Sequence, residues 1–269
     1  MVEPVTLSEV RCLSCRQAFR PQRSDARTCS NACRMALSRH GAGKAFQARG
    51  VSPDAIPLRL CVVEQVTREQ AAGVILRHEW LHSMPTKPTA FYGLLGPSGE
   101  VLGAVCFGLG PGTKSRLLCG PDWQDRTTVL ERGACTPLAA RDAPSHLIAK
   151  AVRLAARDHG WAVFAAYADP AAFEAGALYQ HCNWLRLGAS VGRHPPSIHY
   201  QARPHAGAVW QDERALRRAG IRISDARRLG WQIEALPNRQ RFVTFCGHGR
   251  RAARAALTVE VLPWPKSPA

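Results

Sequence analysis

In the middle of the chain, apolar residues follow two kinds of pattern. Alternation and short apolar runs are typical of strands, and spacing of three to four residues is typical of helices. Strands are predicted at the following residues: 58–66, 90–95, 101–107, 127–136, 162–167 and 184–189. Helices are predicted after the capping pattern that begins at Thr67, over 144–159, and near 171–180. The order β, α, β, β, β, α, β, α, β indicates a mixed α/β sheet with flanking helices.

Polar side chains lie where these predicted elements end. Arg132 interrupts an apolar strand, Ser145 lies in the first turn of a helix, and Asp169 follows a buried strand. Ligands of α/β sheets bind outside the carboxyl ends of strands, so we expect Arg132 and Asp169 to converge. Asp169 could take a proton from a substrate, or it could cap the next helix. Arg132 needs an anionic partner, which a substrate, Glu131 or Asp169 would supply.

Aromatic and amide side chains add to this candidate site. Tyr167 and Tyr179 could stack on a base or donate to a developing oxyanion, or they could be core residues. Ser145 could bond a substrate oxygen or only cap its helix. Asn183, with Tyr167, is a predicted substrate contact.

Charge is concentrated at the two ends of the chain, which carries a formal charge of +16. Residues 1–50 hold nine basic against three acidic residues, 51–202 hold fourteen against twelve, and 203–269 hold thirteen against five. Such arms favour a polyanion, and nucleic acid fits better than a membrane because neither arm has a long apolar face. No apolar run has the length of a membrane span, and the amino terminus, with Glu3 and Pro4, lacks the charged and apolar regions of a signal peptide. We therefore expect a cytoplasmic protein.

Four of the ten cysteines form a cluster with the spacing C-x2-C-x13-C-x3-C: Cys12, Cys15, Cys29 and Cys33. Four thiolates close a tetrahedral zinc site, which would be structural. The alternatives are uncoordinated thiols and a zinc knob that only improves solubility. The other six cysteines are scattered through apolar segments and are predicted to be reduced core residues.

Four parts follow from these patterns: a zinc ribbon at 1–45, a linker at 46–57, a catalytic domain at 58–202, and a basic extension at 203–269. Within the extension, residues 212–229 are predicted to form two short helices joined at Gly220. Their arginines could clamp a nucleic-acid backbone or form a solvated basic face.

Residues 58–200 resemble the Mom family of phage DNA-modifying proteins. The resemblance rests on Tyr167-Ala168-Asp169, Leu178-Tyr179-Gln180 and Asn183-Trp184, with Arg132 and Ser145 upstream. It implies a GCN5-related acyltransferase-like fold, with the zinc ribbon as an added domain in a phage or prophage protein of a bacterial host. It also implies that a carbamoylmethyl group is placed on N6 of adenine in DNA, which protects DNA from restriction. The functional positions it implies are Arg132, Ser145, Asp169, Tyr179 and Tyr92.

The donor of the transferred group is left open. Acyltransferases of this fold hold acyl-CoA with a glycine-containing loop, whereas this chain has Arg141-Asp142-Ala143-Pro144 there. A carbamoylmethyl group is isomeric with a glycyl group, so glycyl-tRNA is a donor candidate beside acyl-CoA. Two other functions remain: a CoA-dependent N-acetyltransferase of a small amine or protein, and a non-catalytic zinc-containing DNA-binding protein.

His78 and His82 are spaced to share one helix face and could bind a second metal, for which the resemblance suggests iron. With Glu79 they form H-E-x-x-H, a metalloprotease signature. Pro85 follows too closely for the long helix of such proteases, and no third ligand signature follows. A protease is therefore not the prediction.

Overall fold

The computed structural model describes residues 10–11, 18–19, 52–79, 81, 83–110, 113–169, 174, 176–189, 199–205, 208, 210–236 and 238–264. The chain divides into two compact units. The larger comprises residues 49–168, 176–188 and 240–269, and the smaller comprises 1–48, 169–175 and 189–239. Each is described separately.

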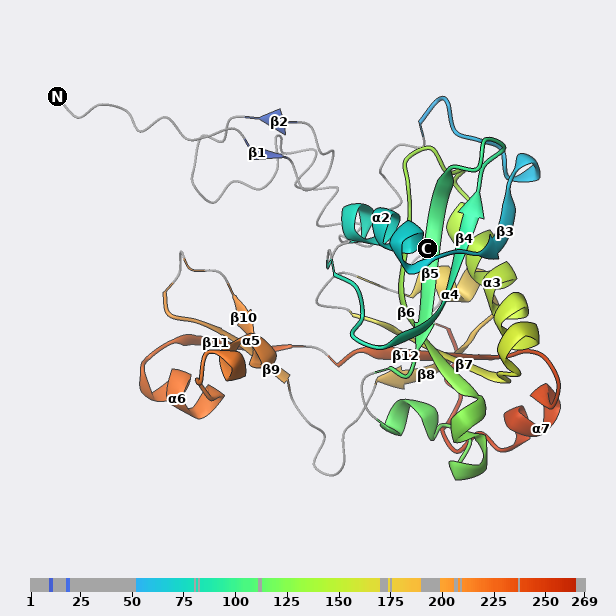
Figure 1. Cartoon of the computed structure of the whole chain (residues 1–269). Helices are drawn as coiled ribbons and strands as arrows, with labels where there is room; N and C mark the ends of the chain where they lie inside the picture. The colour runs from blue at the N-terminus through green and yellow to red at the C-terminus, as the bar shows by residue number, and fades with distance from the viewer. Residues whose placement is uncertain are drawn as a thin grey trace. The chain divides into compact units, whose positions relative to one another are not determined.

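A seven-stranded mixed sheet forms the larger unit (Figure 1). Its strands are β3 (Val62–Gln65), β4 (Pro88–Leu95), β5 (Val101–Gly108), β6 (Thr127–Cys135), β7 (Val163–Ala168), β8 (Leu185–Ala189) and β12 (Gln240–Phe245). Their order in the sheet is β3-β4-β5-β6-β7-β12-β8. The sheet is antiparallel from β3 to β6, and β6 and β7 are parallel. The predicted mixed sheet with flanking helices is confirmed.

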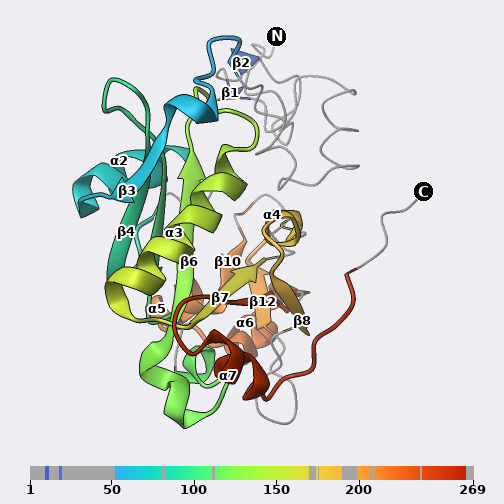
Figure 2. The same cartoon turned by 90° about the vertical axis from the view of Figure 1, so that its right-hand side faces the viewer.

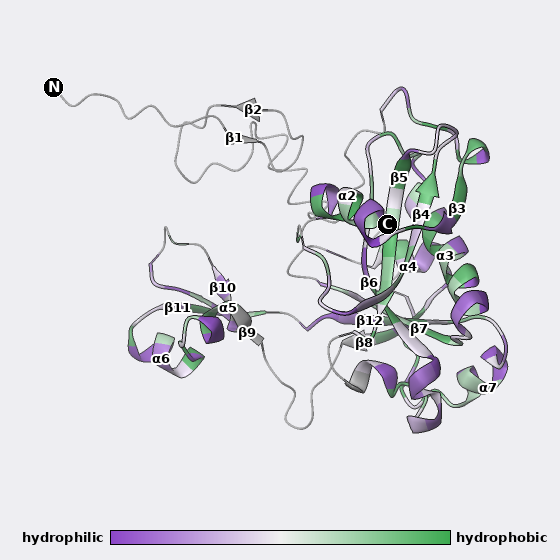
Figure 3. Cartoon of the chain, in the orientation of Figure 1, coloured by the Kyte–Doolittle hydropathy of each residue, from purple (hydrophilic) through white to green (hydrophobic). Residues whose placement is uncertain are grey.

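Two helices cover opposite faces of this sheet, as Figures 1 and 2 both show. One is α2 (Arg68–His78), which begins with the predicted capping box of Thr67 and Gln70. The other is α3 (Ala143–His159), which ends at Gly160 in the left-handed conformation. The apolar side of α3 packs on a core that includes Tyr92, Phe107 and Phe164. In Figure 3, β4 and β5 are coloured mainly as hydrophobic, whereas α2 and α3 have both hydrophobic and hydrophilic residues.

Shorter helices complete the larger unit. They are α4 (Ala177–His181), α7 (Arg250–Ala255) and 3-10 helices at Leu58–Leu60, Thr113–Arg116 and Pro121–Arg126. Successive side chains of β7 point to opposite faces of the sheet. Phe164 and Ala166 pack in the core beneath α3, and Val163 and Ala165 pack in a second core on the other face. None of the described helices is long and apolar enough to cross a membrane.

The element order of residues 62–189 agrees with the predicted series, with two differences at its margins. Residues 58–60 form a 3-10 helix, so the first strand begins at Val62. Residues 240–245, which sequence analysis assigned to the basic extension, form β12 inside the main sheet. β12 pairs antiparallel with β7 over its whole length and separates β7 from β8. A strand supplied from late in the chain therefore completes the catalytic-domain sheet.

The smaller unit contains a three-stranded antiparallel sheet in the order β10-β9-β11. Its strands are β9 (His199–Arg203), β10 (Gln211–Asp212) and β11 (Gln232–Leu236). The helices α5 (Glu213–Arg218) and α6 (Ile223–Arg228) flank Gly220 and confirm the predicted helix pair. Ala202, Leu216 and Ala226 form its buried core. Near the amino terminus, β1 (Val10–Arg11) pairs with β2 (Ala18–Phe19).

Candidate active site

The parallel strands β6 and β7 pair over only part of their lengths. Their ladder runs from Thr127 and Val163 to Leu130 and Ala166. Beyond it, β6 continues to pair with β5 as far as Cys135, and β7 continues to pair with β12 as far as Ala168. The strands therefore diverge at their carboxyl ends, where the ligand sites of α/β sheets are found.

A β-bulge in β6 lies at the point of divergence. Arg132 pairs with Cys106 and Leu130 pairs with Phe107, which leaves Glu131 as the extra residue of the strand. Bulges re-aim side chains and are common beside active sites. This bulge directs the Glu131 carboxylate to the end of β5, where the backbone N–H of Gly110 donates to Oε1 at 2.8 Å.

The Glu131 carboxylate occupies space that a side chain at Gly108 would fill. A Cβ built on Gly108 would lie 2.5 Å from Oε2 of Glu131. Oε2 is buried and has no hydrogen-bond partner among the described residues. Burial raises the pKa of the Glu131 carboxyl, although the Gly110 N–H and the charge of Arg132 act in the opposite direction. A half-buried carboxyl with a raised pKa is a candidate for proton transfer.

Arg132 is held by the segment that follows α2. Its Nε donates to the backbone oxygen of Ser83 at 3.3 Å and lies 4.0 Å from Oε2 of Glu79. Its Nη1 donates to the backbone oxygen of Glu131 at 2.6 Å. Glu79 is 7% exposed, so the anionic partner that Arg132 requires is a buried carboxylate beside it.

Asp169 follows β7 directly and pairs with Arg239, the residue before β12. Oδ2 of Asp169 accepts from Nε of Arg239 at 3.0 Å, and 17% of the Asp169 side chain is exposed. The backbone N–H of Asp169 donates to Oε2 of Glu174 at 2.8 Å. Asp169 thus stands as an oriented carboxylate beside the last residue of β7.

Tyr179 belongs to a stack of aromatic rings on the α3 face of the sheet. Its ring stacks on Phe242 with centroids 4.8 Å apart, and Phe242 stacks on Trp264 at 5.3 Å. The approach of α4 to this stack requires glycine at 176, because a Cβ there would lie 2.3 Å from Phe242. The stack fixes the position of Tyr179 beside the diverging ends of the sheet.

Ser145 lies in the first turn of α3, after the loop from β6. Its hydroxyl donates to the backbone oxygen of Asp142 at 3.0 Å, so it closes the amino-terminal turn of the helix. The side chain of Asp142 makes no capping hydrogen bond. The Ser145 hydroxyl donates to a backbone oxygen, whereas a helix cap accepts from a backbone N–H, so this is not the capping bond weighed in the sequence.

Tyr92, Tyr167 and Asn183 are the other predicted site residues. Tyr92 is fully buried, and its hydroxyl donates to Asp158 near the carboxyl end of α3. Tyr167 packs in the core on the face opposite α3, whereas Tyr179 packs on the α3 face. The two tyrosines therefore lie on opposite faces of the sheet. Asn183 is exposed and lines a pocket with Leu185 and Thr244.

The predicted metal sites fall largely outside the described residues. The four cysteines of the predicted zinc site and His82 all lie outside the described residues: Cys12, Cys15, Cys29, Cys33 and His82. α2 ends at His78, and the backbone of Glu79 is extended. The site expected at His78 and His82 therefore lies in part outside the described residues, because only His78 is among them. Within the described ranges, no group of three or more His, Cys, Asp or Glu residues could hold a metal ion.

The fold defines a mixed α/β protein whose central parallel strands diverge beside carboxylate, arginine and tyrosine side chains. A family model described as the Mom protein family matches residues 60–266. The chain belongs to this family. No curated protein sequence matches the chain.

Solved structures of acetyltransferases are similar to the chain at low identity. A GNAT family acetyltransferase from Elizabethkingia anophelis with acetyl-CoA bound is 12% identical, covers 69% of this chain and 98% of its own, and has a TM-score of 0.39. A variant of spermidine N-acetyltransferase from Vibrio cholerae is 9% identical, covers 73% and 99%, and has a TM-score of 0.40.

Two residues of the candidate site were not predicted in these roles. Glu131 was predicted as a possible partner for Arg132 and not as an acid or base, although a charged residue in an apolar strand was a usable signal. Residues 239–249 carried only a weak echo of the family resemblance, and nothing local indicated the pairing of Arg239 with Asp169, which lies 70 residues away.

Proposed function

We propose that this protein is a DNA-modifying transferase that places a carbamoylmethyl group on N6 of adenine in DNA. The observation that carries the proposal is the match of the Mom family model to residues 60–266. The concentration of positive charge outside residues 51–202 supports a polyanionic substrate.

The chemistry requires help from the protein, because the lone pair of adenine N6 is delocalised into the ring. The enzyme must take the base out of the helix stack and accept a proton as the new bond forms. With glycyl-tRNA as the donor, N6 bonds to the glycyl methylene carbon in place of the glycyl nitrogen, and that nitrogen bonds to the carbonyl carbon in place of the tRNA oxygen. One N6 proton passes through a carboxylate to the departing tRNA oxygen.

Asp169 is the first candidate for that carboxylate, and its ion pair with Arg239 orients it. Glu131 is the second, because burial raises the pKa of its carboxyl and one oxygen has no hydrogen-bond partner among the described residues. We propose that Arg132 binds an anionic group of the donor or of DNA. We propose that Tyr179 stacks on the adenine base or donates a hydrogen bond to the reacting group. Ser145 is assigned to the turn that carries the donor.

The donor is proposed to be an activated glycyl or acyl compound, with glycyl-tRNA and acyl-CoA as the candidates. The loop before α3 places Asp142 and Pro144 where a CoA pyrophosphate would need backbone N–H donors, which favours glycyl-tRNA. Transfer of label from glycyl-tRNA but not from acetyl-CoA would support this choice. The opposite result would assign acyl-CoA.

The first test is mass spectrometry of nucleosides from the DNA of cells that express the protein. We expect a carbamoylmethyl-deoxyadenosine with the unaltered protein and with Asp54→Asn, a matched change of an exposed carboxylate. We expect none with Asp169→Asn. Unmodified DNA in every sample, with folded protein present, would contradict the proposal and favour an N-acetyltransferase or a non-catalytic DNA-binding protein.

A further inference from the structure

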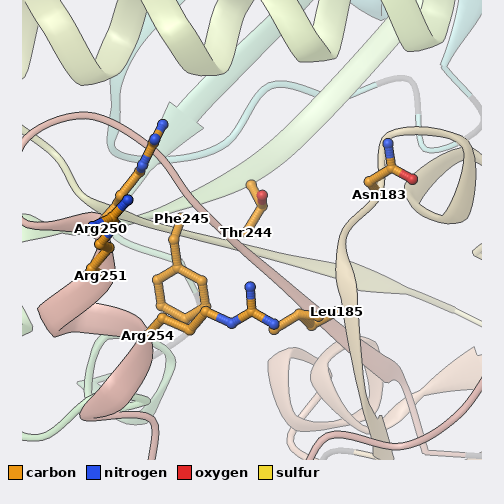
Figure 4. Close-up of a pocket in the computed structure, with 7 residues that line it drawn as sticks. All are labelled: Asn183, Leu185, Thr244, Phe245, Arg250, Arg251 and Arg254. Carbon is orange, nitrogen blue, oxygen red and sulfur yellow. The ribbon is translucent and has the colours of Figure 1, made fainter.

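A pocket of about 320 Å³ lies at the end of the sheet where β12 finishes and β8 begins. It is lined by Asn183, Leu185, Thr244, Phe245, Arg250, Arg251 and Arg254. The three arginines come from α7, and Figure 4 shows the Arg254 side chain extending past Phe245 toward Leu185. Two neutral polar side chains and one aromatic ring also line the pocket, which therefore combines positive charge with a flat apolar surface.

The charge in this pocket is not neutralised from within the described part of the chain. No carboxylate lines the pocket, and Arg250, Arg251 and Arg254 take part in none of the ion pairs found among the described residues. All three are exposed. Like charges carried on one short helix repel one another, so an anion bound beside them is stabilised.

The turn that leads into α7 is fixed by other groups. Arg126 donates through Nη2 to the backbone oxygen of His248 at 2.6 Å and through Nε to that of Gly160 at 3.2 Å. Its guanidinium also lies over the ring of Trp123, 5.2 Å from the centroid. Gly249 has a positive φ of 78° and lies against Trp123 and Arg126, which leaves little space for a side chain. The arginines of α7 therefore project from a helix with an anchored start.

The pocket lies away from the candidate active site. Phe245 pairs with Val163 at the start of β7, whereas Gln240 pairs with Ala168 at its end. Five strand steps separate these positions, which is about 16 Å along β7. Along a duplex that lies parallel to β7, this distance corresponds to about five base pairs.

We propose that the arginine pocket binds a backbone phosphate of DNA at a distance from the adenine that is modified. This inference rests on the proposed function, which it deepens by naming a second DNA contact. Phosphate binds the guanidinium groups, and the sugar lies against Phe245 with Asn183 and Thr244 as neutral hydrogen-bonding neighbours. Such a contact positions the duplex and carries no sequence information.

The experiment measures the salt dependence of DNA binding without any donor. Fluorescence anisotropy with a duplex of about three helical turns is recorded from about 50 to 200 mM salt. The variant R250Q/R251Q/R254Q is compared with R59Q/R68Q/R153Q, which removes the same charge from exposed arginines of the larger unit outside the pocket. Glutamine keeps the helical preference of α7.

We expect the pocket variant to lower the slope of log affinity against log salt by about one to two, and the control to change it by less than half as much. R250K/R251K/R254K should keep the slope and lose affinity, because lysine keeps the charge and loses the bidentate fork. Circular dichroism checks folding, and R254Q alone gives a second variant if the triple variant melts early.

Equal slopes for the pocket and control variants would overturn the proposal. A slope that changes with an RNA hairpin of the same length but not with DNA would also overturn it and assign the pocket to RNA. The binding readout is independent of catalysis, so unmodified nucleosides together with the expected slopes would refute the proposed function and leave the pocket as a DNA contact.

Discussion

The carboxylate of Asp169 and the guanidinium of Arg239 form an ion pair, with Oδ2 and Nε 3.0 Å apart across 70 residues of sequence. Asp169 follows the last residue of β7 and Arg239 precedes the first residue of β12, and these two strand ends pair with each other. Antiparallel pairing of β7 and β12 thereby brings the arginine to the carboxylate. The candidate base is oriented by a residue that sequence analysis placed in a different domain.

This ion pair predicts different results for two substitutions of Arg239. Arg239→Met should reduce DNA modification at least tenfold, because the carboxylate loses its orienting partner. Arg239→Lys should retain part of the activity through the charge alone. Mass spectrometry of nucleosides gives the activity, and urea unfolding gives the stability. Full activity of Arg239→Met would show that the pair has no part in catalysis.

The substitution Gly108→Ala is expected to reduce activity more than stability. In Gly108→Ala the new Cβ would meet Oε2 of Glu131 at 2.5 Å and displace the carboxylate from the Gly110 N–H. We expect at least a tenfold loss of modification and a destabilisation of about 1 kcal/mol. The matched control is Gly73→Ala in α2, where a Cβ meets nothing within 4 Å. That variant should gain about 0.5–1 kcal/mol and stay active. Normal activity of Gly108→Ala would argue against a role for Glu131.

Glu131 also predicts a pH dependence of stability. Its pKa is raised in the folded protein by burial, so its favourable contribution is present below the unfolded pKa and is lost as pH rises through the folded pKa. Glu131→Gln should therefore gain stability relative to the unaltered protein as pH rises from acid to neutral. Urea unfolding across this range measures the difference.

Glu69 provides a control of opposite sign. A backbone hydrogen bond in the first turn of α2 is the main cause that lowers the pKa of the Glu69 carboxyl. The unaltered protein should gain stability over Glu69→Gln above the unfolded pKa and lose that advantage as pH falls through the folded pKa. The same trend for both variants would contradict the assignment of the Glu131 environment.

Tyr92→Phe separates a structural tyrosine from a catalytic one. The hydroxyl of the buried Tyr92 donates to the exposed Asp158 at 3.1 Å, and burial is the main cause that raises the pKa of Tyr92. Asp158 keeps the Nε donor of Arg157 at 2.8 Å in the variant. We expect a loss of about 0.5–1.5 kcal/mol in urea unfolding and unchanged modification. A large loss of activity with near-normal stability would restore Tyr92 to the catalytic set.

The cysteine cluster predicts a bound metal. Purified protein should contain about one zinc ion per chain by elemental analysis, since four thiolates complete a closed tetrahedral site. Cys29→Ser should lose that zinc, whereas Cys246→Ser, outside the cluster, should retain it. Protein that is free of zinc after expression with added zinc would exclude the zinc ribbon.

The sequence by itself determined the local elements of this protein. Apolar periodicity located most strands of the sheet, Thr67 and Gln70 located the start of α2, and Gly160 located the end of α3. These features depend on neighbouring residues and on hydrogen bonds within a turn, so a local pattern specifies them.

The tertiary structure decided which elements meet and which side chains share a site. It inserted β12 between β7 and β8, paired Asp169 with Arg239, and placed Tyr167 and Tyr179 on opposite faces. It also turned Glu131 toward Gly108 through a bulge that has no fixed sequence signature. Long-range strand pairing and burial set these relationships, because they depend on contacts between segments whose separation in the sequence carries no information about their distance in space.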